Sequence, residues 1–301
     1  NDAKLCAISG RYEYKNKGID LYINALNKLN HNGNGQLVAF ILVPGWQQGA
    51  KDLSQPGDRY TTHQLVEPWN DPVSNAFRFY GFNNSVDSRV KVIFVPAYLM
   101  GDDGIFNMSY YDLLAGFDFT VFPSYYEPWG YTPLESLAFK VPTITTSLAG
   151  FGLWVKEHYN INHPGIEVIQ RGDSDSRNVA FEIADWVKSY LEGSVQQLNY
   201  ARDNAKDVSK IALWDNLLEY YRNAYDIALG RTEMRLKDMQ IPINNEVSYI
   251  EKQLSVNNPS WVSVMIHRSI PDKLIALEEL CQNLWWCWHD EARELFHLID
   301  A

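Results

Sequence analysis

Residues 123–135, with the sequence PSYYEPWGYTPLE, form the segment best suited to binding chemistry. Thr132 is followed three residues later by Glu135, which fits a capping box, and Pro133 fits the first position of a helix. We therefore expect a helix to begin here, directly after a strand. Its free backbone amides favour a phosphate, and Gly130 lets a ligand approach the backbone closely. An ordinary capped helix is the alternative, and Glu135 has two candidate roles, closing the cap or reaching a ligand hydroxyl.

Two cations lie in an earlier segment, where Gly10 and Gly18 bracket Arg11 and Lys17. An arginine supplies a fork of donors and a lysine a point charge, so together they suit a diphosphate. Solvated surface cations are the alternative. What favours a ligand site is that both segments follow predicted strands of one parallel sheet, whose carboxyl ends share an edge.

The elements that position these residues alternate between strands and helices. Apolar runs without polar alternation predict strands at residues 5–8, 37–43, 90–95, 119–122 and 143–145. Helical spacing predicts helices from residue 19, over 110–117 behind Ser109 as cap, and over 132–139. Strands of this kind are covered on both faces, so the expected fold is α/β with a doubly wound parallel sheet.

The last part of the chain changes character to long helices. We expect one over residues 180–191, closed by Gly193, and one over 198–229, closed by Gly230. The second carries an apolar stripe that predicts core packing: Trp214, Leu217, Leu218, Tyr221, Ala224, Tyr225 and Ala228. Three segments result: residues 1–230 as a ligand-binding domain, 231–260 as a linker and 261–301 as a helical segment.

Composition narrows the function classes. The formal net charge of −11 repels phosphate backbones and anionic lipid, so neither nucleic acid nor a membrane is an expected partner. There is no basic, apolar leader and no run long enough to span a bilayer, and the odd count of three cysteines suits a reducing compartment, so we expect a cytoplasmic protein. A homo-oligomer is compatible with the sequence.

Motifs for several chemistries are absent from the sequence. Neither a G-x-x-x-x-G-K-[ST] loop nor G-x-G-x-x-G occurs, which argues against a nucleoside triphosphatase and a nicotinamide dehydrogenase. The seven histidines show no metal-ligand spacing, so no metal is expected. What remains is cations, carboxylates and 14% aromatic residues, whose flat faces suit sugars. This inventory suits transfer of a sugar from a nucleotide diphosphate, whose departing charge cations and amides stabilise.

At these residues the sequence resembles the glycogen synthases of the animal and fungal type, retaining glucosyltransferases with two facing Rossmann-like domains (the GT-B fold). Residues 9–13 (SGRYE), 16–18 (NKG) and 123–135 look like its two signature loops. The spacing from Glu127 to Glu135 matches the E-x7-E pattern of retaining GT-B transferases. The resemblance covers roughly residues 3–230 and only the C-terminal half that binds the nucleotide sugar.

The resemblance implies a reaction and a role for each matching residue. Glucose would pass from UDP-glucose, or from ADP-glucose as the other candidate donor, to the non-reducing end of an α-1,4-glucan with retention. Arg11 and Lys17 would hold the donor diphosphate and stabilise its departure. Glu127 would lie at the anomeric centre, as stabiliser or nucleophile, and we favour the stabiliser. The resemblance also implies the remaining donor contacts. Uracil would stack on Tyr110, and the ribose hydroxyls would bind Glu135. Glucose would lie against Trp129, Gly130 and Tyr131, with the phosphates near Thr132.

Two departures from the family pattern limit what carries over. Residues 201–207 hold one arginine and one lysine, where eukaryotic members have an arginine-rich helix that senses glucose 6-phosphate, so activation by a sugar phosphate is in doubt. The acceptor-binding N-terminal domain of the family is absent, so we expect this chain alone to be inactive. The donor sugar is the only small molecule expected, with no separate cofactor.

The tail carries a second, shorter resemblance. Residues 277–300 look like the opening helix of bacterial α-glucan phosphorylases, which predicts a synthase fused to a phosphorylase-like region. The alternative is a C-terminal helix that packs on the preceding domain. Two other functions stay open at this point: a phosphorylase-related fragment, for which no Schiff-base lysine motif is found, and a non-catalytic glucan-binding module.

Overall fold

The computed structural model describes residues 3–238, apart from residues 33, 53, 55–56, 160–163 and 173–175. The chain divides into two units, Asn1–Leu218 and Glu219–Ala301. The first unit holds the sheet and the candidate site.

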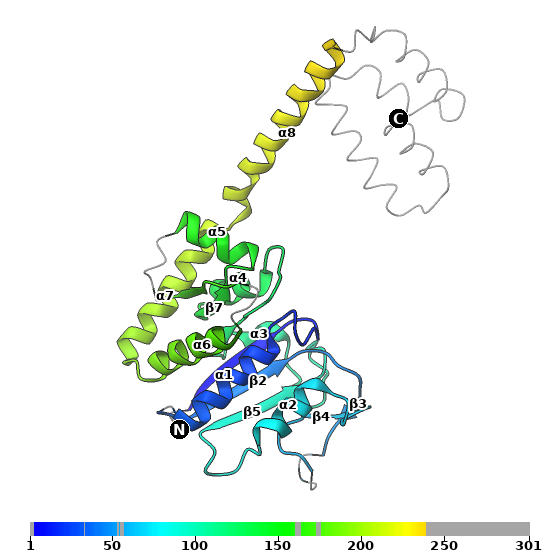
Figure 1. Cartoon of the computed structure of the whole chain (residues 1–301), viewed down its shortest axis with the longest axis vertical. Coiled ribbons are helices and arrows are strands. Elements are labelled where there is room, and N and C mark those ends of the chain that lie inside the picture. Colours follow the sequence, from blue (N-terminus) through cyan, green and yellow to red (C-terminus); the bar gives the residue numbers. More distant parts are fainter. Residues whose placement is uncertain are drawn as a thin grey trace, which may run out of the picture. The chain divides into compact units, whose positions relative to one another are not determined.

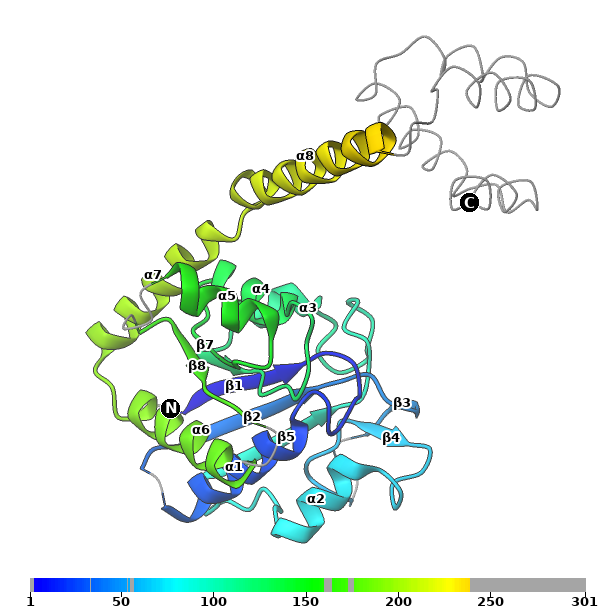
Figure 2. The ribbon, with the colours of Figure 1, turned by 45° about the horizontal axis from the view of Figure 1, so that its top comes forward.

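The central sheet consists of six parallel strands in the order β5-β2-β1-β6-β7-β8 (Figure 2). Its strands are β1 (Lys4–Ser9), β2 (Leu37–Leu42), β5 (Val90–Val95), β6 (Phe119–Val121), β7 (Thr143–Thr146) and β8 (Ile166–Ile169). From β1 the chain adds β2 and then β5 on one side of the sheet. It then returns to the other side of β1 and adds β6, β7 and β8 in turn. All five predicted strands are present, and the parallel arrangement is confirmed.

Helices cover both faces of this sheet, as expected for a doubly wound fold (Figure 1). On one face, Cys6 and Ile8 of β1 pack in a core shared with α1 (Ile19–Asn32), α2 (Pro72–Tyr80) and α6 (Ser176–Leu191). On the other face, Ala7 packs with Leu114 of α3 (Tyr110–Leu114). Successive residues of β1 therefore enter different cores, which is why its sequence is apolar without alternation.

A second group of helices packs at the β7–β8 end of the sheet. The helices are α4 (Tyr131–Ala138), α5 (Gly150–His158) and α7 (Val195–Ile211). Leu137, Phe151 and Val208, one from each helix, share a buried cluster with Ile166 of β8. The first turns of α4 and α5 carry residues of the candidate site, so this packing fixes where those turns lie.

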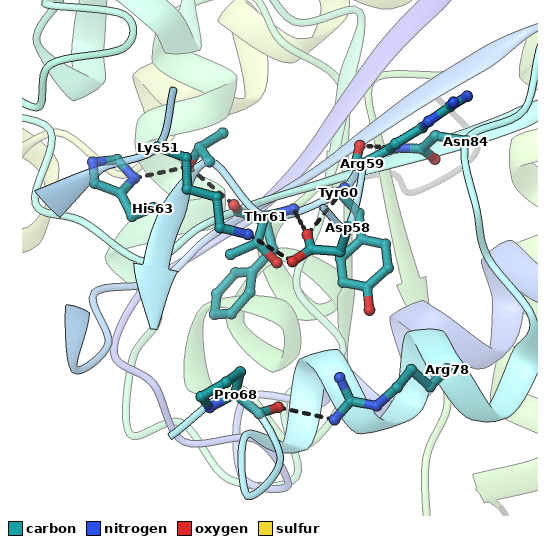
Figure 3. Close-up of polar contacts among 11 residues, drawn as sticks. Lys51, Asp58, Arg59, Tyr60, Thr61, His63, Pro68, Arg78 and Asn84 are labelled. Atoms are coloured by element: carbon teal, nitrogen blue, oxygen red, sulfur yellow. Dashed lines mark hydrogen bonds and ion pairs between the residues drawn. The ribbon is translucent and has the colours of Figure 1, made fainter. Parts of the chain in front are cut away.

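Between β2 and α2 the chain makes an excursion that the sequence did not predict. It contains a two-stranded antiparallel sheet, β3 (Gln47–Ala50) and β4 (His63–Leu65). Figure 3 shows the polar contacts that hold it: Lys51 pairs with Asp58 at 2.6 Å, and the Asp58 carboxylate accepts from the Thr61 amide at 2.8 Å. Burial acts to raise the pKa of Asp58, but these two contacts outweigh it and hold that pKa below its ordinary value. The Thr62 amide then donates to the Phe94 carbonyl, which ties the excursion to the edge of β5.

The prediction of one long helix over residues 198–229 is wrong. It is two helices, α7 and α8 (Trp214–Asp238), interrupted at residues 212–213. The physical reason is a side-chain cap: Asn216 Nδ2 donates to the last carbonyls of α7, those of Lys210 and Ile211. Gly230 lies inside α8 and closes nothing.

The apolar stripe on α8 is not core in the described part of the chain, which corrects the packing prediction. Trp214 is 62% exposed, and Leu218, Tyr221 and Tyr225 are exposed as well. Helix α8 also continues to Asp238, into the segment predicted as a linker. The predicted final segment, residues 261–301, lies outside the described residues. No helix among those described has the length and hydrophobicity needed to span a bilayer.

Candidate active site

The candidate site lies where the strand order reverses, between the carboxyl ends of β1 and β6. In open parallel sheets this point opens a crevice, because the connections from the two strands leave toward opposite faces. The loop after β1 carries Lys17, and the loop after β6 carries Glu127. Both predicted segments therefore meet at the same edge of the sheet, as expected from the sequence.

The two loops are in direct backbone contact. The Tyr125 amide donates to the Asn16 carbonyl at 2.8 Å. Gly18 has φ +68°, and a Cβ on it would lie 2.1 Å from the Pro123 carbonyl oxygen. Only glycine fits such a close approach, so the identity of residue 18 sets how near the loops lie.

An ion pair joins the two loops at their centre. Lys17 Nζ donates to Glu127 Oε2 across 110 residues of sequence. The two side chains are 16% and 22% exposed, so the pair is largely shielded yet open to a ligand. Two of the three residues predicted to be catalytic are thus brought into contact.

Arg11, the third of these residues, lies elsewhere in the loop. Its guanidinium pairs with Glu13 at 2.9 Å, and its side chain is 77% exposed. It is therefore a solvated cation near the crevice and not a partner of Glu127. Its role on a donor diphosphate stays a prediction.

The start of α4 differs from the predicted capping box. Helix α4 begins at Tyr131, and its N-cap is Gly130 with φ 109° and no side-chain cap. Pro133 is thus the third helical residue and not the first. Glu135 does not close the cap, because it accepts a hydrogen bond from Tyr111 at 3.0 Å. The first amides of α4 therefore carry no side-chain acceptor, which leaves the N-terminus open to an anion.

Adjacent tyrosines of α3 take different positions at the crevice. Tyr110 shares a 2.8 Å hydrogen bond with Ser9 at the end of β1, and burial, together with the charge of Glu135, raises its pKa to about 12. Tyr111 is 46% exposed, stacks on Phe139 and holds Glu135. The tyrosine that donates a hydrogen bond to Glu135 is thus Tyr111. The sequence analysis missed it, although it stands next to Tyr110 in the sequence.

The other predicted donor contacts are spread over the start of α4. Trp129 packs edge-on against Phe151 at 5.7 Å and contacts Trp154, so α5 holds its ring. Tyr131 is 64% exposed, whereas Thr132 is half-buried.

Helix α5 supports the backbone of the site and was not predicted. The Gly150 amide donates to the Glu127 carbonyl at 3.0 Å, and the Phe151 amide to the Trp129 carbonyl at 2.7 Å. A Cβ on Gly150 would lie 2.1 Å from the Pro128 carbonyl oxygen. The backbone on both sides of Pro128 is therefore clamped by the first turn of α5.

A buried arginine in the segment that follows β8 supports the same loop. Arg171 is 4% exposed, and its Nη1 donates to the carbonyls of Pro123 and Ser124, both at 3.0 Å. Its guanidinium lies 3.6 Å from the centre of the Tyr125 ring. No sequence pattern marks this residue, since a single arginine after a short strand is usually exposed on the surface.

Among the described residues, no group of three His, Cys, Asp or Glu side chains could hold a metal ion. The groups that the site brings together are a lysine, a carboxylate and the first backbone amides of α4.

Two solved glycosyltransferases have a similar backbone. WaaG, which is involved in lipopolysaccharide biosynthesis, is 17% identical with a TM-score of 0.42 over 70% of this chain and 43% of its own. A glycosyltransferase from Rickettsia africae is 16% identical with a TM-score of 0.45, over 76% and 48% respectively. The strand order β5-β2-β1-β6-β7-β8 by itself defines a doubly wound sheet.

The curated relatives are much longer than this chain. Liver glycogen [starch] synthase of Mus musculus is 28% identical over 74% of this chain and 41% of its own length. The Caenorhabditis elegans and Neurospora crassa glycogen [starch] synthases are 27% and 26% identical, with 43% and 41% of their lengths covered. The chain thus spans about two fifths of the relatives it matches.

Two family models match along the chain. Residues 270–301 match one described only as a protein of unknown function (DUF3417), so the phosphorylase resemblance of the tail stays a prediction. Residues 54–272 match the model described as glycogen synthase, and this range holds Glu127 and Glu135. Because that match covers more than half of this chain, the chain belongs to the glycogen synthase family.

Proposed function

We propose that this chain is the donor-binding half of a retaining glucosyltransferase that moves glucose from UDP-glucose to the non-reducing end of an α-1,4-glucan. The observation that carries the proposal is the Lys17–Glu127 pair at the switch point of the sheet. It brings a cation and a carboxylate together at the switch point, where open parallel sheets bind their ligands. Family membership supports the same reaction class.

The donor diphosphate would lie between Lys17 and the first amides of α4, with Arg11 available from solvent. When the bond between glucose C1 and the diphosphate oxygen breaks, both bonding electrons leave with UDP. Lys17 and the α4 amides stabilise that charge because they are already in place before the bond breaks. Arg11 would leave Glu13 to reach the phosphates, since its side chain is exposed.

Glu127 would act on the sugar. Positive charge grows at C1 as the diphosphate departs, and a carboxylate nearby lowers its energy. The acceptor hydroxyl then bonds to C1 on the face that the diphosphate left, and its proton passes to a phosphate oxygen. This sequence retains the configuration at C1. We favour this stabilising role over a covalent one.

Binding of the acceptor glucan is assigned to another part of the complete enzyme. The acceptor glucan would be held by the acceptor-binding domain that family members carry in addition, and the complete enzyme would need it for turnover. We place the enzyme in the cytoplasm, with which the free, buried thiol of Cys6 is compatible.

Calorimetric titration of this chain with UDP, UDP-glucose and ADP-glucose tests the proposal. We expect uridine nucleotides to bind, and Lys17→Met to weaken them by about 1.5 to 3 kcal/mol, the range for bonds to charged groups. Arg11→Ala should also weaken their binding, and Arg89→Ala, just before the first residue of β5, is the matched control. Tighter binding of ADP-glucose would change the donor, and nucleotide binding that is equal in wild type and Lys17→Met would refute the site.

A further inference from the structure

Tyr111 is the side chain that holds Glu135 at the candidate site. Its hydroxyl donates to Glu135 Oε1 at 3.0 Å. This hydrogen bond, and then the charge of Glu135, raise the pKa of Tyr111 above its ordinary value of 10, so the hydroxyl keeps its proton at neutral pH and remains the donor. Within the described part of the chain, this is the one side-chain hydrogen bond that the Glu135 carboxylate accepts.

The Tyr111 ring is itself held against α4. It stacks on Phe139 with ring centres 5.5 Å apart and planes 10° apart, and it contacts Tyr110 at 5.3 Å with a tilt of 59°. Glu135 and Phe139 are four residues apart, so their side chains are neighbours, and Tyr111 contacts both. Because two rings fix its orientation, the Tyr111 hydroxyl is a fixed donor, although the side chain is 46% exposed.

The Glu135 carboxylate lies within reach of a ligand bound at the start of α4. Glu135 is the fifth residue of this helix, and helical side chains lean toward the N-terminus, so the carboxylate lies over the first turn. That turn carries the amides that no side chain caps. Glu135 is only half-buried. A ligand whose anionic group binds those amides therefore brings its next group to Glu135.

A pair of adjacent hydroxyl groups matches this carboxylate. An ionised carboxylate only accepts, and it has about four lone-pair sites, of which Tyr111 uses one. In a nucleoside diphosphate the ribose follows directly on the diphosphate, so its 2′ and 3′ hydroxyls come to Glu135 when the phosphates lie on the α4 amides. A 2′-deoxyribose has lost one of these two donors.

We propose that Tyr111 is a positioning residue that makes the donor site prefer ribonucleotides over 2′-deoxyribonucleotides. The inference rests on the proposed function, which places the donor diphosphate at the first amides of α4. Fixing a flexible glutamate side chain costs conformational entropy. Tyr111 holds Glu135 before the ligand arrives, so both ribose hydroxyls meet an acceptor that is already oriented. Without that hydroxyl the carboxylate rotates more freely, and the advantage of the second ribose hydroxyl shrinks.

Calorimetric titration of the 301-residue chain with UDP and 2′-deoxy-UDP tests the inference. We expect UDP to bind at least about tenfold more tightly in wild type, as for a hydrogen bond to a charged group. Tyr111→Phe keeps the ring and removes the hydroxyl, so it should reduce this preference to about threefold or less, mainly by weakening UDP. The melting temperature should stay that of wild type, because both ring contacts remain. Tyr200→Phe, which alters a 55% exposed tyrosine on α7, is the matched control and should leave both affinities unchanged.

Glu135→Ala tests whether Tyr111 acts through the carboxylate. This variant should lose most of the preference for UDP. In the Glu135→Ala background, Tyr111→Phe should change UDP affinity by less than about twofold, because the group that the hydroxyl positions is gone. An equal effect of Tyr111→Phe in both backgrounds would overturn the positioning role.

The remaining outcomes separate this inference from the proposed function. UDP binding that Lys17→Met weakens, with the same preference in wild type and Tyr111→Phe, would overturn the role of Tyr111 and leave the donor site standing. Equal weakening of both nucleotides in Tyr111→Phe would overturn it as well, since the hydroxyl would then support the site without selecting the sugar. Tighter UDP binding in Tyr111→Phe would show that the hydroxyl competes with the ribose, against the proposal. Absence of UDP binding in wild type would overturn the proposed function and this inference with it.

Discussion

At the scale of single residues, the ion pair between Lys17 and Glu127 explains how two charged side chains can be stable where they are largely shielded from water. Each group neutralises the other, so neither is left as an isolated charge with little water around it. A diphosphate would compete with Glu127 for Lys17, which frees the carboxylate to face the sugar. In the proposed function, the same contact thus keeps both charges paired until a donor competes for Lys17.

A double-mutant cycle on this pair should show measurable coupling. We expect Lys17→Met and Glu127→Gln to couple by about 1 kcal/mol in the free energy of unfolding, because the pair is largely shielded. The exposed pair Lys140–Asp203, at 3.0 Å with side chains 48% and 70% exposed, is the matched control and should couple by at most about 0.5 kcal/mol. Urea denaturation of the variants measures both values. Equal coupling in the two pairs would contradict the shielding argument.

Arg171 should matter for stability more than its single charge suggests. Arg171→Met removes two hydrogen bonds. The Pro123 carbonyl loses the partner it has in the described part of the chain, whereas the Ser124 carbonyl keeps the Thr146 hydroxyl, so the change should cost about 1 to 3 kcal/mol. Arg89→Met, whose guanidinium makes one long bond of 3.4 Å to the Gly35 carbonyl, should cost less than about 1 kcal/mol. Thermal denaturation of both variants makes the comparison. Similar losses would show that the loop after β6 does not depend on Arg171.

At the scale of elements, the strands were predictable and several helices were not. Strands buried on both faces leave an unbroken apolar run, and each such run is a strand here. Helix α2 was missed although its signals are present, with Asp71 as N-cap, Pro72 first and Gly81 as C-cap. Helix α5 gave no such signal, because it begins Gly150-Phe151-Gly152. Those glycines serve close contacts to Pro128 and Thr146, so tertiary packing overrides helix propensity.

The contact between the loops after β1 and β6 should tolerate no side chain at position 18. Gly18→Ala places a Cβ 2.1 Å from the Pro123 oxygen, whereas Gly81→Ala has a similar φ of +72° and nothing within 4 Å. Both variants bear the cost of a left-handed residue, about 1 kcal/mol. Gly18→Ala should cost about 2 kcal/mol more, because one loop must move. Equal unfolding free energies would mean that the loops separate freely, and UDP titration would then show no difference either.

Strand β8 carries a carboxylate that should lower stability at neutral pH. Burial, followed by the charge of Glu182, raises the pKa of Glu167 above its ordinary value of 4.5, and Lys156 opposes this only in part. The folded state therefore binds the proton more tightly than the unfolded state, so stability is lost as pH rises above 4.5. Glu167→Gln should raise the urea midpoint at pH 7 and make little difference below pH 4.5. Glu157→Gln, on the exposed face of α5, should change the midpoint at neither pH.

At the scale of the whole chain, the site is assembled from segments that the sequence places far apart. The sheet edge that joins Lys17 and Glu127 was predictable, because parallel strands end on the same side. The supports from α5 and Arg171 were not, since they depend on which loop a distant backbone touches. The same holds for the break at residues 212–213, where a side chain of α8 caps α7 without any glycine or proline.

Within the described residues, every buried apolar side chain lies before residue 213, although the glycogen synthase match continues to residue 272. We therefore expect a chain ending at Leu218 to keep the melting temperature and UDP affinity of the 301-residue chain. A chain ending at Gly193 loses α7, whose Leu198, Ala205 and Val208 are buried, and should lose roughly 5 kcal/mol. Calorimetry of the three chains measures both effects. If the chain ending at Leu218 melted earlier or bound UDP more weakly, residues beyond 218 would contribute to the donor domain, in agreement with the extent of the family match.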